Sequence, residues 1–575
     1  MPSVASRFHS SMIRNPTALL IILIATYFIG IFDHGLWAPM DTVGAGMIWG
    51  MRDAGSWVIP LLNGAPYLEK PPLMHWTALL LVAATGSLNE AVIRMPSALY
   101  ALGAVLIVYF WGRREHNERV GLCAAFLCTA SLLYLEYSKT TLTDSTLVFA
   151  VILSMQLFWW AYSLHRNKVL GYLPFIVVSA LAFFAKGLVG VAFIWTPTMA
   201  FLAYRRQWRW FWLLPALYLP MFSLLIGYWA YKVWLIGGEE YLRIIFVDNQ
   251  FGRFFTFSDV SLPADPYFVH KEHLYYYLLD LPPRILPWVV LLPPALYYWF
   301  RPRVGRKDSD FSVYLKFAVV VMLLILHASS AKVSEYALPV LPILFFMAAV
   351  WLDAELRAWK SSIGKWAIVL GGFSAGLVAL VPPLIVIGLY FAPPRFLDRY
   401  TSSIDVLRVV GEHAASAYVL ASLLLSGAIV AVMAWAGSLL GSDQRRSLAD
   451  AYPGTITLLL MIGLTLFNQI YDPQRSCKPV ADTLWRQQQD GRHIALGTDA
   501  THVTGCMTFY LNRKLAVYDT FQTAVNFLDN NRPAVLLLEK DDLKKDAFSG
   551  LPQRFSVTPV EYPGIAARNY VLVRN

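Results

Sequence analysis

The feature that most constrains this chain is the repetition of long apolar segments separated by short basic ones. Of its 575 residues, 57% are hydrophobic and 15% are charged, and the mean hydropathy is +0.50. A soluble fold cannot hide that much apolar surface, and stretches of about 18 or more apolar residues are typical of transmembrane helices. The sequence therefore predicts a polytopic α-helical membrane protein, and it excludes disordered and collagen-like chains.

Thirteen segments are apolar enough to be predicted as membrane crossings. The first follows a basic N-terminus, and no small-residue cleavage site comes after it, so we expect a retained span rather than a cleaved signal peptide. The segment 73–86 is also apolar, but it is short for a crossing and fits an interfacial or re-entrant helix. The predicted spans are about 17–35, 94–112, 119–137, 145–163, 171–185, 188–203, 210–231, 285–300, 311–328, 336–353, 367–391, 416–438 and 454–470.

The charges between the spans test this count. With the N-terminus in the cytoplasm, every loop on the cytoplasmic side is basic, as the positive-inside rule requires. If 73–86 were a full crossing, the basic loop 113–119 would move to the opposite face. The net charge of +10 is thus assigned to cytoplasmic loops, and no basic face or motif for nucleic acid is present. We expect a protein of the bacterial inner membrane with no nucleic-acid partner.

The residues after about 470 have a different pattern. Short apolar runs such as HIALGT, LAVYDT, PAVLLLEK and NYVLVRN predict strands, and two intervening stretches predict helices. The sequence therefore predicts a transmembrane domain at 1–470 and a small periplasmic α/β domain at 471–575. Cys477 and Cys506 both lie in this second domain and could form a disulfide in an oxidising compartment. The domain shows no G-x-G-x-x-G fingerprint and no catalytic cluster.

The loops on the predicted periplasmic face carry the polar residues from which chemistry could be built. Asp41 lies just beyond the first span, where it could be a general base, a metal ligand or only a helix cap. Glu69 and Lys70 follow a tight turn and could hold a metal and a phosphate, respectively. Together with Tyr67 they could instead belong to an interfacial belt.

Three further loops add charged and aromatic side chains to the same face. Asp144 begins a predicted span, a position that helix capping alone would explain. Asp248 is a possible second metal ligand, and Arg253 a possible phosphate fork. Lys332 and Tyr336 lie in a polar turn between two apolar spans, which is costly in lipid unless it lines a polar cavity.

Metal binding by histidines is a weaker alternative in the same region. The spacing of His270 and His273 is compatible with a metal site, although such histidines are more often interfacial. Taken together, carboxylates, cations and tyrosines from separate loops suit a phosphate-bearing lipid whose head group lies at the interface. They do not suit an ion path, because charge within the spans is sparse.

These stretches resemble motifs of the GT-C membrane glycosyltransferases. The resemblance is to the bacterial branch that contains the lipid A aminoarabinose transferases and protein O-mannosyltransferase-like enzymes. Residues 64–76, GAPYLEKPPLMHW, resemble the family's Y-x-E-K-P-P-L-x-Y-W stretch, and residues 329–339 resemble its Ser-Ser-x-Lys-x-x-x-Tyr-x-Leu-Pro turn. The stretches DNQFGRF, at 248–254, and LTDS, at 142–145, fit as well. The resemblance covers the whole chain, including the thirteen-span order and the C-terminal periplasmic domain.

The resemblance implies a sugar donor on a polyprenyl phosphate, undecaprenyl phosphate in bacteria, and an inverting transfer. It implies that Asp41 and Asp144 are the catalytic carboxylates of the first two periplasmic loops. It assigns the donor phosphate to Lys70 and Arg253. The other carried-over residues are a sugar pocket of Tyr67, Tyr336 and Lys332, and a divalent metal site, zinc in the first instance, of Glu69 and Asp248.

One departure from the family bears on the sugar. The aminoarabinose transferases follow the first Asp with Glu and, two residues later, Arg, whereas Thr42 and Gly44 stand at these positions here. Asp248 also stands where relatives can offer His, and carboxylate oxygens alone suit harder cations too. The donor sugar and the metal therefore stay open.

We accordingly predict a monomeric glycosyltransferase that moves a sugar to a periplasmic acceptor, in the first instance aminoarabinose or a related sugar to lipid A. Within the class, the alternative acceptors are another glycan or a protein hydroxyl. Outside it, a lipid or polysaccharide transporter would show internal repeats and charge within spans, and neither stands out. A non-enzymatic envelope scaffold would leave the one-sided clustering unexplained.

Overall fold

A computed structural model gives the fold of most of the chain. The described residues are 16–164, 168–252, 272–302, 308–358, 364–374, 475–544, 548–560 and 569–575, with isolated residues between 378 and 472. Most of the predicted spans 367–391, 416–438 and 454–470 lies outside the described residues, as do the predicted site residue Arg253 and His270.

Six helical segments in the described part are long and apolar enough to cross a membrane. They are Glu90–Glu115 (α5), Asp144–Ser163 (α8), Lys168–Lys186 (α9 and α10), Trp208–Gly252 (α12 with a π-helical end, η1), Asp310–Ala328 (α16) and Ser334–Ala358 (η3 and α17). Shorter apolar segments are Leu73–Thr85 (α4), Leu188–Tyr204 (α11) and Trp288–Phe300 (η2 and α15). The predicted polytopic helical character is confirmed, whereas the count of thirteen spans stays a prediction.

Two predicted spans differ from the helices that form. The first helix, Pro16–Phe28 (α2), ends well before the predicted residue 35, because Gly30 takes a left-handed φ of 87° that stops it. The predicted span 119–137 is two helices, Glu118–Thr129 (α6) and Leu132–Tyr137 (α7). They separate where the amide of Leu132 donates to the carbonyl of Leu286 instead of to its own helix.

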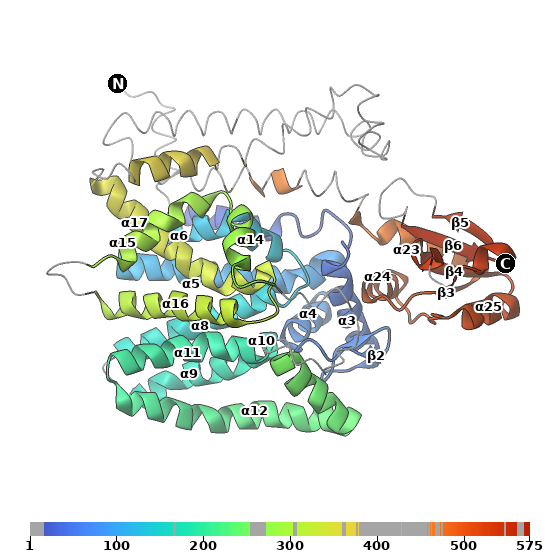
Figure 1. The fold of residues 1–575 in the computed structure, drawn as a ribbon, viewed down its shortest axis with the longest axis horizontal. Coiled ribbons are helices and arrows are strands. Elements are labelled where there is room, and N and C mark those ends of the chain that lie inside the picture. The colour runs from blue at the N-terminus through green and yellow to red at the C-terminus, as the bar shows by residue number, and fades with distance from the viewer. Residues whose placement is uncertain are drawn as a thin grey trace.

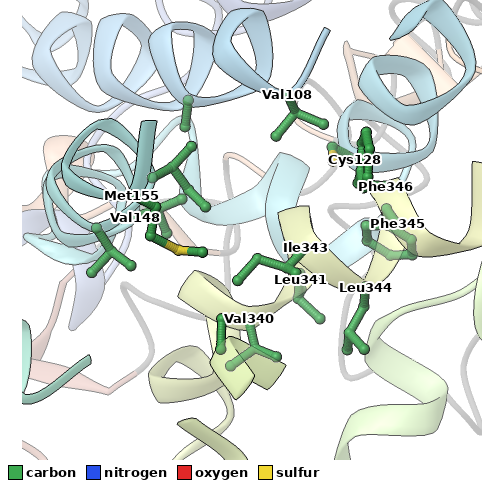
Figure 2. Packing of buried hydrophobic residues seen from close by; sticks show 14 of the residues in the cluster. Val108, Cys128, Val148, Met155, Val340, Leu341, Ile343, Leu344, Phe345 and Phe346 are labelled. Atoms are coloured by element: carbon green, nitrogen blue, oxygen red, sulfur yellow. The ribbon is translucent and has the colours of Figure 1, made fainter. Parts of the chain in front are cut away.

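Close packing of α5, α6, α8 and α17 forms the centre of the bundle. Figure 2 shows Val108, Cys128, Met155 and Phe346, one from each of these helices, around a single apolar core in which all four are buried. Small residues permit the closest approach, since a Cβ on Gly112 of α5 would lie only 2.4 Å from the Cα of Gly121 of α6. Cys128 is thus a packing residue, as its apolar surroundings in the sequence predict.

The C-terminal domain is built on a mixed four-stranded sheet. Its order is β3 (His493–Leu496), β4 (Ala534–Glu539), β6 (Tyr570–Arg574), β5 (Ser556–Pro559), with β3 and β4 parallel and the other pairs antiparallel. Its main helices are Lys478–Gln489 (α23), Thr501–Leu511 (α24) and Phe521–Asn530 (α25). The predicted α/β character is confirmed, except that the predicted strand LAVYDT contributes only an isolated bridge between Leu496 and Val517.

Two short helices lie between the bundle and this domain (Figure 1). Met40–Ala54 (α3) follows the first helix, and α4 comes after a two-residue hairpin of Leu61–Leu62 (β1) and Ala65–Pro66 (β2). The thirteen residues of α4 span about 20 Å, too short for a hydrocarbon core of about 30 Å. The expected interfacial helix therefore forms as a separate element. Its neighbour α3 carries the first predicted catalytic carboxylate, Asp41, in its first turn.

Candidate active site

The carboxylate of Asp41 is buried in a polar cage rather than open to solvent. Arg94 of α5 donates to Oδ2 through Nη2 at 2.6 Å and Nε at 3.2 Å, and the amide of Thr141 donates to Oδ1 at 3.1 Å. Asp41 is 3% exposed and Arg94 is fully buried. Asp41 is thus held in one orientation by a bidentate cation, which suits a group that orients a substrate.

Arg94 also binds the backbone of the loop between α2 and α3, which is called the first loop below. Its remaining N–H groups donate to the carbonyls of Ile31 at 3.1 Å, His34 at 3.0 Å and Gly35 at 2.6 Å. No sequence motif drew attention to this residue. The signal was present, because an arginine at the edge of a predicted span is expensive in lipid unless it is paired.

Asp144, the second predicted carboxylate, forms an ion pair with Lys186. Asp144 begins α8 and Lys186 ends α10, so both lie at the same end of the bundle. The ammonium of Lys186 also lies 4.2 Å from the ring centroid of Tyr336 in a cation–π contact. The structure thus brings together two predicted residues, Asp144 and Tyr336, through a lysine that was not among the predicted site residues.

A third carboxylate, Glu335, stands beside this pair. It is next to Tyr336 in the chain, and it accepts a hydrogen bond from the Tyr137 hydroxyl at 3.2 Å. Among the described residues, Asp41 and Asp144 each have a cationic partner, whereas none within salt-bridge distance is found for Glu335. Glu335 was not predicted, because it falls at a variable position of the Ser-Ser-x-Lys turn.

Lys70 and Lys186 line one cavity of about 260 Å³. Glu69, Asn249 and Gln250 add polar groups to its wall, and most of the other lining residues are apolar. The lining residues are Glu69, Lys70, Pro71, Leu147, Lys186, Leu188, Val189, Ala192, Phe193, Asn249, Gln250, Phe251, Ile325, Leu326, Ser329, Ala331 and Tyr336. A cavity whose wall combines two cations with mainly apolar side chains fits an amphiphile with an anionic head group.

The loop that carries Lys70 is tied to the segment that follows α12. The Asn249 side-chain amide donates to the carbonyl of Leu68 at 3.2 Å, and Gln250 Oε1 accepts from the amide of Leu188 at 2.8 Å. Gly187 must be a glycine here, because its φ is +74° and a Cβ would meet Oε1 of Gln250 at 2.1 Å. These contacts fix the cavity wall next to Lys186.

The other predicted site residues lie around the cavity rather than in it. Tyr67 packs with Val43, Met47 and Leu62 against α3. Lys332 is buried and donates to the carbonyls of Ser329 at 2.5 Å and Glu272 at 3.1 Å, so it supports the turn that carries Tyr336.

The described residues do not assemble a metal centre. Asp248 is buried with its Oδ1 3.9 Å from Nε of Arg243, and Glu69 lines the cavity. In the described part of the chain, no group of three or more His, Cys, Asp or Glu side chains could hold a metal ion. A zinc site takes at least three protein ligands, so the described residues alone do not supply one. No chemical step is derived through a metal, and the predicted site of Glu69 and Asp248 stays a prediction.

His75 lies on α4, shortly after Lys70 in the chain, and it makes the unfolding free energy of the protein depend on pH. It is fully buried, and burial, helped by the positive charge of Lys70, lowers its pKa from 6.5 to about 4. The unfolded chain therefore binds a proton that the folded protein does not as pH falls below about 6.5. We expect a loss on the order of 3 kcal/mol of unfolding free energy on acidification through pH 4.

Thermal unfolding of detergent-solubilised protein at pH 7.5 and pH 4.5 measures this loss. His75→Phe should unfold at a less pH-dependent temperature than the wild type. His493→Phe, which changes an exposed histidine on β3, should keep the wild-type dependence. Equal pH dependence in the wild type and His75→Phe would show that His75 does not contribute.

Comparisons with known proteins place this arrangement in a family. The family model of dolichyl-phosphate-mannose-protein mannosyltransferases matches residues 69–230. An undecaprenyl phosphate-alpha-4-amino-4-deoxy-L-arabinose arabinosyl transferase of Sodalis glossinidius is 29% identical over 358 residues, 60% of this chain and 60% of that relative. The transferase of the same description from Pseudomonas aeruginosa is 26% identical over 409 residues, 70% of this chain and 71% of that protein.

A solved structure agrees with the sequence matches. The crystal structure of ArnT from Cupriavidus metallidurans bound to undecaprenyl phosphate has a TM-score of 0.73 at 18% identity, and the match covers 97% of each chain. In sequence and fold this chain is similar to the GT-C membrane glycosyltransferases. It is therefore an integral membrane enzyme, and the predicted resemblance is confirmed. The segment matched by the family model contains Glu69, Lys70, Arg94, Asp144 and Lys186, so it includes most of the charged residues of the site.

Proposed function

We propose that this enzyme transfers a sugar from undecaprenyl phosphate to a periplasmic acceptor, and that the acceptor is lipid A. The cavity that contains Lys70 and Lys186 carries the proposal. A lipid phosphate needs cations for its head group and an apolar wall for the first part of its chain. Both features meet in this cavity, and the named function of the arabinosyl transferase relatives supports the same donor.

The chain's own residues account for the steps of an inverting transfer. The acceptor oxygen forms a bond to the anomeric carbon from the face opposite the phosphate. The bond from that carbon to the phosphate oxygen breaks, and the lipid phosphate leaves with the electron pair. Lys70 and Lys186, with Arg253 as a further predicted ligand, stabilise the negative charge that develops on this phosphate.

The carboxylates then orient the reactants. Arg94 holds the Asp41 carboxylate in place through an ion pair, and Lys186 does the same for Asp144. A lipid A phosphate is already ionised near neutral pH, so a phosphate acceptor needs no strong base. This agrees with an orienting role for Asp41. A glycan or protein hydroxyl is the alternative acceptor and would require a base to take its proton.

The location of the site is part of the proposal. The N-terminus is cytoplasmic, and the cavity end of the bundle, α3, α4 and the C-terminal domain are periplasmic. The bond between Cys477 and Cys506 supports this orientation, because disulfides persist in oxidising compartments such as the periplasm. Aminoarabinose or a related sugar is the proposed donor sugar. A divalent metal, zinc in the first instance, stays a prediction of the family resemblance.

Mass spectrometry of lipid A and of polyprenyl-phosphate sugars, with and without the gene, tests donor and acceptor together. Loss of the gene should remove one sugar-bearing form of lipid A and cause its polyprenyl-phosphate sugar to accumulate. Accumulation of the donor with unchanged lipid A and a changed glycan or protein would assign the alternative acceptor. If neither the donor nor the acceptor changes while a lipid or glycan is mislocalised, the result would favour a transporter and contradict the proposed sugar transfer.

Lys70→Met should weaken donor binding. Loss of a charged hydrogen bond to the phosphate costs about 1.5–3 kcal/mol, so we expect the donor KM to rise about 10- to 100-fold in vesicles. Lys544→Met is the matched control, because this lysine pairs with Asp541 on the surface of the C-terminal domain at 2.6 Å. An unchanged donor KM in Lys70→Met would remove Lys70 from the phosphate site.

A further inference from the structure

The C-terminal domain contacts the loop before α3, and the carbonyls of this same loop accept hydrogen bonds from Arg94, the partner of Asp41. We propose that this domain is a positioning part of the active site, acting on Asp41 through Gly505 and Tyr510 of α24. The inference rests on the proposed function in one respect, namely that Asp41 takes part in the transfer. Beyond the proposed function, the inference is that the C-terminal domain, which has no catalytic cluster of its own, determines the position of Asp41.

The first contact is a crossing of α24 over α3 with the two backbones touching (Figure 1). A Cβ on Gly505 would lie 2.3 Å from the carbonyl oxygen of Thr42, and one on Gly46 would lie 2.4 Å from the Cα of Gly505. Real Cβ atoms do not approach this closely, so a larger residue at position 505 must displace α3 or α24. Thr42 follows Asp41 directly, and the displacement would reach the carboxylate.

The second contact is made to the loop before α3. The hydroxyl of Tyr510 accepts from the amide of Leu36 at 2.8 Å and donates to Glu90 Oε1 at 3.1 Å. Glu90 begins α5, the helix that carries Arg94, four residues further on. Tyr510 thus joins the C-terminal domain to both the loop and the helix from which the Asp41–Arg94 pair is built.

The loop itself is held from two sides at Gly35. Its amide donates to Asp472 Oδ1 at 2.8 Å, and its carbonyl accepts from Arg94 Nη2 at 2.6 Å. Asp472 also accepts from the indole of Trp37 at 2.9 Å, and Trp37 pairs with Ser476 in an antiparallel bridge. Arg94 therefore binds a peptide that is fixed by the chain leading into the C-terminal domain.

The disulfide links these two contact regions. Cys506 follows Gly505 on α24, and Cys477 stands directly before α23 with its amide donating to the carbonyl of Leu36 at 3.1 Å. The bond therefore ties the α3 crossing to the loop contact. The residues that line the donor cavity come instead from the segments that carry Lys70, Leu147, Lys186, Gln250 and Tyr336, so disturbing the C-terminal domain should affect orientation more than donor binding.

Gly505→Ala and Tyr510→Phe test the proposal in the full-length protein in vesicles. We expect Gly505→Ala to lower kcat at least 10-fold and Tyr510→Phe about 3- to 10-fold, each with a donor KM within twofold of the wild type. Tyr518→Phe is the matched control, because Tyr518 stacks on Phe527 inside the C-terminal domain and should leave kcat unchanged. A donor KM that rises in step with the fall in kcat, or an unchanged kcat in Gly505→Ala, would overturn the proposal.

Hydrogen–deuterium exchange on the same proteins without substrate gives a readout that does not depend on the reaction. Amides 35–46 should exchange faster in Gly505→Ala and in Cys477→Ser/Cys506→Ser, while amides of the donor-cavity segment 186–193 should be unchanged. Unchanged exchange at 35–46 would overturn the proposal even if the wild type is active. If exchange changes as expected but the wild type transfers no sugar from the undecaprenyl-phosphate donor, the proposed function fails and the positioning stands.

Discussion

Lys186→Met is expected to lower the rate of sugar transfer about 10²- to 10³-fold at saturating donor, the range found when one preorganised charge donor is removed from an active site. Lys186 lies in the donor cavity, paired with Asp144 and stacked against Tyr336. Its charge is thus fixed before the phosphate begins to leave. Removing it also leaves Asp144 as a buried carboxylate without its cation, which adds repulsion toward the departing phosphate.

The rate is measured as transfer from undecaprenyl-phosphate sugar in vesicles, with the donor varied so that kcat and KM are separated. Lys316→Met is the matched control. Lys316 also pairs with a carboxylate, Asp308, but it lies near the beginning of α16, roughly 14 Å along the helix from the cavity residues at its end. A kcat within twofold of wild type in Lys186→Met would show that this lysine does not act on the leaving phosphate.

The sequence was a good guide to the bundle because burial in lipid leaves a long, continuous signal. It was a poor guide to where helices stop, since single backbone events decide that. Gly30 ends α2 by its left-handed φ, and Leu132 starts a new helix because its amide is bonded to Leu286, more than 150 residues away. Neither event has a local pattern from which it could be predicted.

The site residues also fall into those that a local motif could predict and those that it could not. Asp41, Lys70 and Asp144 could be predicted as site residues because they stand in loops beside recognisable motifs. Their partners were missed, because Arg94 lies 53 residues from Asp41 and Lys186 lies 42 residues from Asp144. Such pairs are determined by which helices pack together. A bond between Cys477 and Cys506 was only a possibility that depended on the compartment, and it forms.

Arg94→Met is expected to be the most destabilising single change considered for this protein. It leaves the carboxylate of Asp41 buried with only the Thr141 amide, and breaking a buried ion pair in this way costs about 3–5 kcal/mol. Asp41→Asn should cost less, because Arg94 keeps three carbonyl acceptors, those of Ile31, His34 and Gly35. The measurement is the fraction of monodisperse protein that survives heating in detergent.

The double variant distinguishes the cost of an unpaired carboxylate from the cost of the lost loop contacts. Asp41→Asn with Arg94→Met removes both charges, so it should survive heating better than Arg94→Met alone, although the first loop then lacks the Arg94 hydrogen bonds. If the double variant is no more stable than Arg94→Met, the cost comes from the lost loop contacts and not from an unpaired carboxylate.

Transfer activity then decides whether Asp41 has a role beyond stability. A transfer rate unchanged in Asp41→Asn would remove Asp41 from the reaction, both as the group that orients the acceptor and as a base. A large loss in Asp41→Asn, with heating behaviour close to wild type, would assign the effect to chemistry. In that case the pair with Arg94 serves to hold a carboxylate immobile at the point where the acceptor must be oriented.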